Sequence, residues 1–360
     1  MSGRKSGAPT RTRAGPASTR ERAPHDLVRP EGVPEDAILR LLHVPAEAAG
    51  MRVDVFVQSR LRRTSRTRAR AIVERSAYTH DGRRLAASDR VREGQTIALW
   101  RDPFEPDGEL APLPVLYEDE HLLVIDKPPF VAVHPTARYH KHTVIKRLEA
   151  ERPGEFLALI HRLDRETSGV LMLARTPEAE REFKLLLERR SLAPDAPESA
   201  CEKEYLALVR GEPPDGLIDL PLEPDPESEL RVKMRVAAPG TGLPARTEVQ
   251  VLERRAGYAL VRCGLHTGRQ HQIRVHLAAL GHPLVGDKLY GPDERLLARA
   301  ADGRLTPEDL AVLELSRHAL HAHCYRLVHA MTGRPLVLVS PLPPDLDQFW
   351  QGLSEPPGSD

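Results

Sequence analysis

The sharpest contrast between apolar and polar positions lies near the middle of the chain. Residues 157–160 form a short apolar run, residues 169–174 (GVLMLA) form a second, and the polar octapeptide HRLDRETS stands between them. Apolar runs of this length predict buried strands rather than helices. We therefore predict that HRLDRETS is a loop held between two core strands, where a rigid scaffold can present reactive groups.

Apolar spacing also predicts a small module over residues 39–100. Val53 and Phe56 begin a helical stripe, although the alternating valines in the same stretch also fit a strand. Residues 64–75 then read as a second helix with Ser65 as its candidate N-cap. An Asp-Gly pair follows and predicts a turn between short strands. The expected order is helix, helix, then short strands.

Composition assigns the segments around this module. Residues 1–38 are rich in Arg, Pro, Ser and Gly and hold too little apolar surface to fold, which predicts a disordered basic tail. Residues 101–113 are rich in Pro and acidic residues and are typical of a linker between domains. The main domain is expected over residues 114–350, followed by a flexible C-terminal tail over residues 351–360.

The charge of the whole chain is balanced, but its distribution is not. Lys plus Arg and Asp plus Glu each total 52, whereas residues 1–75 carry 16 basic and 8 acidic residues. A cluster of this kind forms either a solvated charged face or a surface for phosphate contacts. The residues predicted to bind RNA phosphates are Arg62, Arg63, Arg66, Arg68 and Arg70.

The cysteines and the longest apolar runs indicate the compartment. Cys201, Cys263 and Cys324 are odd in number, widely spaced and without a CxxC pair, which argues against disulfides and a structural zinc site. No apolar run approaches the roughly 20 residues that span a bilayer. We expect a cytoplasmic protein with no membrane partner.

Asp164 is the candidate reactive group of the central loop. Arg162 and Arg165 flank it, and opposite charge favours the ionised form of a carboxyl group. An ionised carboxylate on a loop between buried strands can act as a nucleophile. Most loop aspartates, however, only cap a turn or pair with a surface arginine, and this spacing alone leaves that reading open.

Two longer strings resemble one known family. HRLDRETSG followed by an apolar run resembles the catalytic motif of the RluA-type RNA pseudouridine synthases. These enzymes detach uracil from its ribose and rejoin it through carbon 5. GRQHQIRVHLAALGHPLVGDKLYG, over residues 268–291, resembles the same family's GRxHQxRxH motif and the GDxxYG turn that follows it. The resemblance extends over residues 115–346.

The resemblance implies roles for particular side chains. Asp164 would be the nucleophile, and Arg162 would fill the space that the uridine leaves in the RNA when it flips into the site. Arg269 would form an ion pair with Asp164 and orient it. Ile273 would pack against the target base from one side, and Tyr205 of the string KEY would stack on it.

Three further residues lie in the matching strings. His161 and Arg274 belong to the two long motifs and are predicted to contact the substrate. The string DKPPFVAVHPT fits a further family motif, but Phe130 stands where a glycine is usual. The resemblance therefore implies that the loop around Phe130 can have a different conformation in this protein.

The resemblance also implies a fold and a partner. The fold class expected is α+β, with a mixed, largely antiparallel central sheet in the catalytic domain. The module over residues 39–100 resembles the small RNA-binding domain shared with small-subunit ribosomal protein S-four. RNA is the expected partner, with large-subunit ribosomal RNA favoured and transfer RNA as the alternative. No cofactor is expected, and the protein is expected to be a monomer.

Three other functions were weighed. Histidines are frequent in residues 266–282 and 318–323, which suggests a metallohydrolase, but their spacings do not repeat on one helical face. Asp164 with Glu166 could be a glycosidase pair, although two positions on a loop fix no separation between the carboxyls. An inactive synthase body could serve as an RNA-binding assembly factor. Asp164→Asn separates that last reading from an enzyme.

Overall fold

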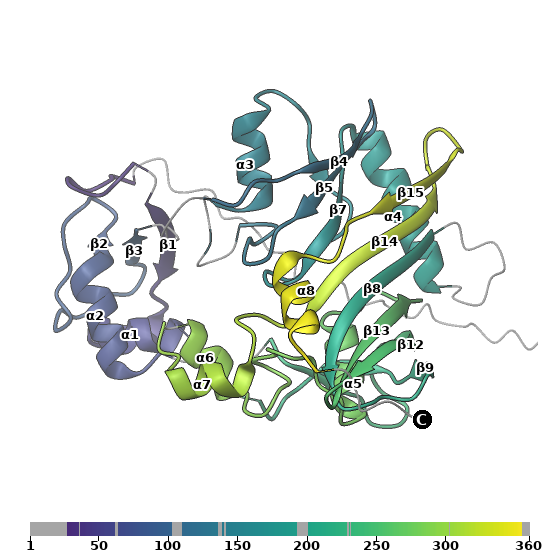
Figure 1. Cartoon of the computed structure of the whole chain (residues 1–360). Helices are drawn as coiled ribbons and strands as arrows, with labels where there is room; N and C mark the ends of the chain where they lie inside the picture. The colour runs from purple at the N-terminus through teal and green to yellow at the C-terminus, as the bar shows by residue number, and fades with distance from the viewer. Residues whose placement is uncertain are drawn as a thin grey trace, which may run out of the picture. The chain divides into compact units, whose positions relative to one another are not determined.

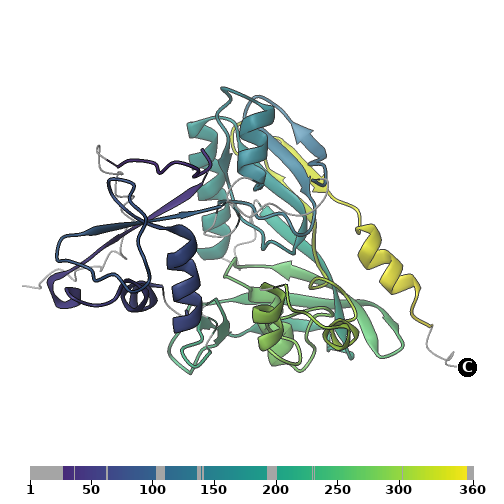
Figure 2. The same cartoon turned by 90° about the vertical axis from the view of Figure 1, so that its left-hand side faces the viewer.

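The chain divides into two compact units, residues 1–103 and 104–360. The computed structural model of the protein (Figures 1 and 2) describes residues 27–354, apart from 36, 62–63, 103–109, 136–138, 140–141, 193–200, 229, 231 and 302. In these ranges no helix is both long and apolar enough to cross a membrane.

The first unit contains two helices and a small antiparallel sheet. Within the described residues the sheet has the strand order β1-β3-β2. Phe56 and Val57 of the first helix and Val73 of the second are fully buried in a core that belongs to this unit. The elements are β1 (Ile38–His43), the 3-10 helix η1 (Ala46–Ala48), α1 (Val53–Arg60), α2 (Arg66–Ser76), β2 (Ala77–Thr79) and β3 (Thr96–Arg101).

The predicted order of helix, helix and short strands holds from α1 to β3, but β1 precedes the helices and was not predicted. The oxygen of Ser65 accepts a hydrogen bond from the Arg68 backbone N–H at 3.2 Å, as the N-cap of α2. Gly82 has a φ of +85°, which the turn after β2 requires and glycine adopts without strain. The RNA-binding role that the S-four resemblance implies stays a prediction.

The predicted tails were too long. The Val28 N–H donates to the His80 carbonyl at 2.9 Å, and β1 already begins at Ile38, so the ordered chain starts before residue 39. At the other end, Leu353 packs beside Trp350. The prediction failed because the composition of a segment shows whether the segment can form a core of its own. It does not show whether the segment packs against a neighbouring domain. The rest of both tails lies outside the described residues.

The predicted basic residues of α2 do not share one surface. Arg66, Arg68 and Arg70 are all exposed, whereas Arg62 and Arg63 lie outside the described residues. Arg66 and Arg70 are about one turn apart, but Arg68 is rotated by about 200° from Arg66. The helix therefore presents its arginines on two flanks of the buried stripe.

The second unit is built on a mixed sheet, which confirms the predicted α+β class. Within the described ranges the strand order is β4-β5-β7-β14-β8-β13-β12-β9, with β6 on β7 and β15 on β14 (Figure 1). Among these pairings only β7 with β14 is parallel. The strands are β4 (Val115–Glu118), β5 (Leu122–Lys127), β6 (Ala158–Leu159), β7 (Ser168–Ala174), β8 (Cys201–Arg210), β9 (Gly216–Asp219), β12 (Arg246–Arg255), β13 (Tyr258–Leu265), β14 (Leu320–Val328) and β15 (Pro335–Val339).

Helices cover both faces of this sheet, and the alternation along β8 shows how. Tyr205 and Ala207 point into the main core with residues of α4, while Leu206 and Leu208 point to the opposite face, where Trp350 of α8 packs. Figure 2 shows α8 in yellow at the C-terminal end. The other elements are α3 (Val144–Glu151), α4 (Pro177–Leu192), β10 (Leu222–Pro224), β11 (Met234–Val236), α5 (Gln272–Ala279), α6 (Arg295–Ala301), α7 (Pro307–Leu313) and α8 (Pro344–Gln351).

The parallel pairing of β7 with β14 depends on a glycine. Gly169 has a φ of +108°, and a Cβ there would lie 2.2 Å from the Ala322 carbonyl oxygen. The two backbones can therefore approach only because residue 169 has no side chain. This contact fixes the start of β7 and, with it, the end of the preceding loop.

Candidate active site

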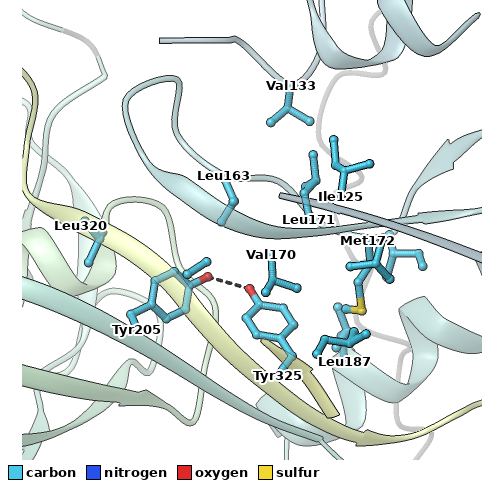
Figure 3. Close-up of a cluster of buried hydrophobic side chains, with 14 of the residues drawn as sticks. Ile125, Val133, Leu163, Val170, Leu171, Met172, Leu187, Tyr205, Leu320 and Tyr325 are labelled. Carbon is cyan, nitrogen blue, oxygen red and sulfur yellow. Dashed lines mark hydrogen bonds between the residues drawn. The ribbon is translucent and has the colours of Figure 1, made fainter. Parts of the chain in front are cut away.

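The predicted loop lies between two core strands, as expected. It begins after β6 and ends at β7, and Leu163 anchors its middle in the main core (Figure 3). Because Leu163 points inward, its neighbours are directed outward. Arg162 is exposed and Asp164 keeps 33% of its side chain exposed.

Buried histidines hold the end of this loop. Thr167 Oγ1 lies 2.8 Å from His318 Nε2, and Ser168 Oγ lies 3.0 Å from His321 Nδ1. Burial lowers the pKa of His318 to about 3 and that of His321 to about 4, so both rings are neutral hydrogen-bonding groups near pH 7. Both histidines therefore hold the loop by neutral hydrogen bonds. Among the described residues no group of three or more metal-ligating side chains is arranged to hold a metal ion.

The C-terminal helix is also tied to the loop. Arg317 is fully buried, and its Nη1 donates to the Glu166 carbonyl at 3.2 Å. Its Nε and Nη2 donate to the two carboxylate oxygens of Asp345, in the first turn of α8, at 2.6 and 3.0 Å. One arginine therefore links α8 to the backbone of the loop that carries Asp164.

A pocket opens beside the loop. It is a small pocket that is open to solvent on one side. Side chains from the loop, from β8 and from α5 converge on it, although these segments are far apart in the sequence. It is lined by Arg162, Leu163, Asp164, Thr167, Tyr205, Leu265, Arg269, His271, Gln272, Ile273, Arg274 and Leu320.

Asp164 is paired with Arg274 in this pocket. Arg274 Nη1 donates to Asp164 Oδ2 at 2.9 Å. The same guanidinium is held from behind by Asp287, which accepts from Nε at 2.7 Å and from Nη2 at 2.8 Å. Arg274 is 7% exposed and Asp287 fully buried, so little water competes for these bonds. The arginine is fixed by one carboxylate and presented to the other.

Asp287 is itself held by the backbone around it. Its Oδ1 also accepts the N–H groups of Leu289 at 2.9 Å and Tyr290 at 3.0 Å. The preceding Gly286 has a φ of +74°, and a Cβ there would lie 1.9 Å from the Arg317 carbonyl oxygen. The close approach of Gly286 to the Arg317 backbone fixes the conformation of the GDKLYG turn. In this conformation the turn places the Asp287 carboxylate behind Arg274.

These contacts keep Asp164 ionised. Burial alone would raise the pKa of the Asp164 carboxyl, but the neighbouring His271 and Arg274 outweigh it and hold the pKa below its usual value. His271 lies with Nε2 3.8 Å from Asp164 Oδ2, and burial lowers its own pKa, so Arg274 supplies the permanent positive charge. Near pH 7 the pocket contains a carboxylate with an accessible oxygen.

The predicted partner of Asp164 was wrong. Arg269 lines the mouth of the pocket, but its Nε donates to the Pro244 carbonyl at 2.9 Å, and Arg274 occupies the position next to Asp164. Arg269 lies before α5, where the side chain reaches the rim. Arg274 lies within α5, whose first turns are buried and face the loop. An arginine from a distant segment does pair with Asp164, as predicted, but it is Arg274 rather than Arg269.

Two residues expected to contact substrate have other surroundings. Arg274 is engaged on both sides by carboxylates, which assigns it to orienting Asp164 rather than to the substrate. His161 does not line the pocket. Its Nε2 accepts the Met172 N–H at 3.2 Å, and burial lowers its pKa to about 3. The His161 ring therefore points toward β7, whereas the side chain of Arg162, the next residue, points outward.

Tyr205, Ile273 and Arg162 all line the pocket, as residues in contact with a base would. Figure 3 shows Tyr205 pointing toward Tyr325, and the two hydroxyls lie 2.8 Å apart. Burial raises the pKa of Tyr205 to about 12, so its ring is a neutral phenol. Their roles toward a substrate stay predictions.

The structure adds residues to which the sequence analysis gave no role. His271 has a φ of +56°, which is rare for a residue with a side chain, and its Nδ1 lies 2.8 Å from the Tyr290 hydroxyl. Tyr290 also lies with its ring 5.0 Å from the Arg274 guanidinium. His271, Asp287 and Tyr290 all lie within the second family string, residues 268–291, so the motif match was the signal that could have found them.

Glu166 is not positioned as a second catalytic carboxyl. It does not line the pocket, and its two oxygens accept from Lys288 Nζ at 3.0 and 2.9 Å. Burial opposes its ionisation, but His318 and Lys288 lower the pKa of the Glu166 carboxyl. The pair is structural, since it joins the loop to the GDKLYG turn. This geometry does not support the glycosidase reading.

Known proteins resemble the chain over most of its length. A sequence model of the family described as RNA pseudouridylate synthase matches residues 121–279. Ribosomal large subunit pseudouridine synthase D of Nitrosomonas europaea is 35% identical, over 88% of this chain and 89% of its own. The protein of the same name from Xanthomonas campestris is 34% identical, over 89% of this chain and 95% of its own.

A solved structure is also similar. Human RNA Pseudouridylate Synthase Domain Containing 1 is 26% identical, covers 71% of this chain and 100% of its own, and has a TM-score of 0.50. Its name and those of the relatives agree with the motifs on the central loop and at α5. The chain therefore belongs to the RluA-type RNA pseudouridine synthases, a family of isomerases.

Proposed function

We propose that this protein converts uridine to pseudouridine in large-subunit ribosomal RNA. The observation that carries the chemistry is the carboxylate of Asp164, which lies in a pocket with Tyr205 and is held ionised by Arg274. The ribosomal substrate is supported by the names of the relatives from Nitrosomonas europaea and Xanthomonas campestris. Transfer RNA is the alternative substrate.

The pocket supports a division of labour among its side chains. The target uridine leaves the RNA stack and enters between Tyr205 and Ile273, while Arg162 at the exposed edge fills the space it vacates. Asp164 offers an electron pair to the flipped nucleotide. The bond from N1 to C1′ breaks with its electron pair left on N1, the base rotates while held, and C5 joins C1′, so that Asp164 regains its electron pair. C5 then loses its proton and N1 gains one, which leaves an isomer of the starting uridine. Arg274 fixes the direction of the carboxylate throughout.

The protein is further proposed to act as a monomer in the cytosol. The three cysteines are buried and free, which suits a reducing compartment. The catalytic side chains named above come from one chain.

The substrate proposal is tested by mapping pseudouridine in ribosomal and transfer RNA from cells that lack this protein. We expect at least one large-subunit position to lose pseudouridine completely, and to regain it when the wild-type protein is supplied but not when Asp164→Asn is. Loss confined to transfer RNA would replace the proposed substrate with the alternative. Unchanged maps of both RNA classes would contradict the proposal.

The arginines of α2 are proposed to contact RNA phosphates. Replacing Arg66 and Arg70, which lie about one turn apart on the same flank of α2, together with glutamine should weaken binding of the ribosomal RNA substrate. It should also lower the slope of log affinity against log salt by about 1.4, since each single-strand phosphate contact contributes about 0.7. Filter binding over a range of KCl concentrations measures this slope. As a matched control, Arg181→Gln on α4 removes an exposed arginine from the second unit. A slope that stays at the wild-type value in the double variant would remove α2 from the RNA interface.

A further inference from the structure

Phe130 is an exposed aromatic residue with an unusual backbone. Its side chain is 41% exposed, and its φ of +66° lies in the left-handed region that residues with a Cβ seldom adopt. The family motif that the string DKPPFVAVHPT resembles has a glycine at this position. Backbone strain and an exposed phenyl ring both oppose a purely structural role, since a glycine would remove both.

The ring is held next to the catalytic loop. The guanidinium carbon of Arg165, the residue after Asp164, lies 5.5 Å from the centroid of Phe130 and 5.1 Å from that of Tyr139. Arg165 Nη1 also donates to the Phe130 carbonyl at 3.4 Å. A cation and two aromatic rings therefore cluster at the flank of the loop that carries the reactive carboxylate.

This cluster has a rigid base. Lys127 is fully buried, and its Nζ donates to the Pro128 carbonyl at 2.8 Å, the Val131 carbonyl at 3.0 Å and the Arg165 carbonyl at 3.2 Å. The backbone on either side of Phe130 is thereby joined to the backbone of the catalytic loop. On the other side, Arg165 Nη2 donates to Glu166 Oε1 at 3.3 Å.

We propose that Phe130, with Arg165 and Tyr139, is a stacking subsite for an unpaired base that neighbours the target uridine. The proposal rests on the proposed RNA substrate. Stacking on aromatic rings needs no hydrogen-bond code, and a neighbouring guanidinium adds a cation for the base and the phosphate. Because flipping one nucleotide unstacks its neighbours, an aromatic ring at the flank of the loop that carries Asp164 offers one of them a replacement partner. Because the backbone on either side of Phe130 is already fixed by Lys127, RNA binding would cost little conformational entropy in this part of the protein.

Phe130→Gly tests the subsite. Glycine suits the positive φ, so the backbone keeps its conformation while the ring is lost. We expect binding of a fluorescein-labelled oligouridine of ten nucleotides, measured by anisotropy, to weaken about 5- to 150-fold. With unmodified large-subunit RNA, KM should rise by a similar factor while kcat at saturating RNA changes less than threefold.

Matched variants separate stacking from a simple apolar contact. Phe130→Leu keeps an apolar side chain and the strained backbone but has no aromatic face, so it should bind as weakly as Phe130→Gly. Phe130→Tyr should bind like wild type. Phe156 is also 41% exposed but lies outside the cluster that Phe130 and Tyr139 form with Arg165, and Phe156→Leu should leave affinity unchanged. Wild-type affinity in Phe130→Gly, or in Phe130→Leu, would overturn the subsite.

The two readouts distinguish failure of the subsite from failure of the proposed substrate. If ribosomal RNA is not modified but Phe130→Gly loses affinity for oligouridine, the substrate proposal falls and the stacking subsite stands. If ribosomal RNA is modified and Phe130→Gly binds both RNAs like wild type, the subsite falls and the proposed function stands. Failure of the wild-type protein to bind oligouridine would also overturn the subsite.

Discussion

Asp164→Asn will abolish pseudouridine formation, by at least about 10⁴-fold in kcat, while RNA binding survives. Asparagine has nearly the same shape as aspartate, and its oxygen can still accept from Arg274 Nη1. It carries no negative charge, however, and cannot supply the electron pair that the reaction needs. Release of tritium from RNA containing 5-tritiated uridine measures the reaction, because C5 loses its proton when it bonds to the sugar.

The outcome separates an enzyme from an RNA-binding assembly factor. The affinity for RNA and the midpoint of thermal unfolding should both stay close to the wild-type values. Glu149→Gln is a suitable control, because Glu149 is an exposed carboxylate of α3 whose ion pair with Lys146 contributes little. It should be as active as wild type. Residual activity of Asp164→Asn above about one per cent would remove Asp164 from the chemical step.

Arg274→Lys will lower kcat by about 100-fold and move the acidic limb of the pH–rate profile to higher pH. The three N–H donors of a lysine are all on one nitrogen, whereas Arg274 reaches Asp164 and the two oxygens of Asp287 from three different nitrogens. Without the guanidinium, the positive charge and the hydrogen bond that lower the pKa of Asp164 are weakened, so this pKa rises. The variant should therefore lose activity at a higher pH than the wild type as the solution is acidified. Single-turnover rates between pH 4 and pH 8 would measure the shift.

The same substitution will reduce stability in a pH-dependent way. Pairing with Arg274 lowers the pKa of both Asp164 and Asp287, so the pair stabilises the fold above the unfolded-state pKa of about 4. That contribution is lost as the pH falls through the folded-state values. Arg274→Lys should therefore cost about 3 kcal/mol at pH 7 and progressively less in acid. Urea unfolding at several pH values measures it.

Arg269→Lys is the matched control for this experiment. Arg269 lines the pocket mouth but bonds to a backbone carbonyl, so its replacement should leave the acidic limb where it is, whatever it does to KM. An acidic limb that moves with Arg269→Lys and stays in place with Arg274→Lys would restore the ion pair first predicted from the sequence.

Local pattern was sufficient for the parts of this protein that depend on near neighbours. The polar loop between two apolar strands, the cap of α2 by Ser65 and the turn at Gly82 all follow from residues a few positions apart. The family strings also predicted that the segments of Asp164, Tyr205 and Ile273 meet at one site, and these three residues do line one pocket. A motif can indicate this because it marks segments that come together in the folded family, although it gives no distances or directions. The direction of each side chain was not contained in the strings.

By itself, the sequence determined which segments meet, and the tertiary structure decided which side chains touch. Arg269 and Arg274 are five positions apart, and no spacing rule tells which of them faces a carboxylate 110 residues away. The choice was made by the burial of α5 and by Asp287, whose turn is shaped by contact with the backbone at Arg317. The reason is physical: a charge partner is selected by direction and desolvation, and both exist only after distant elements have packed.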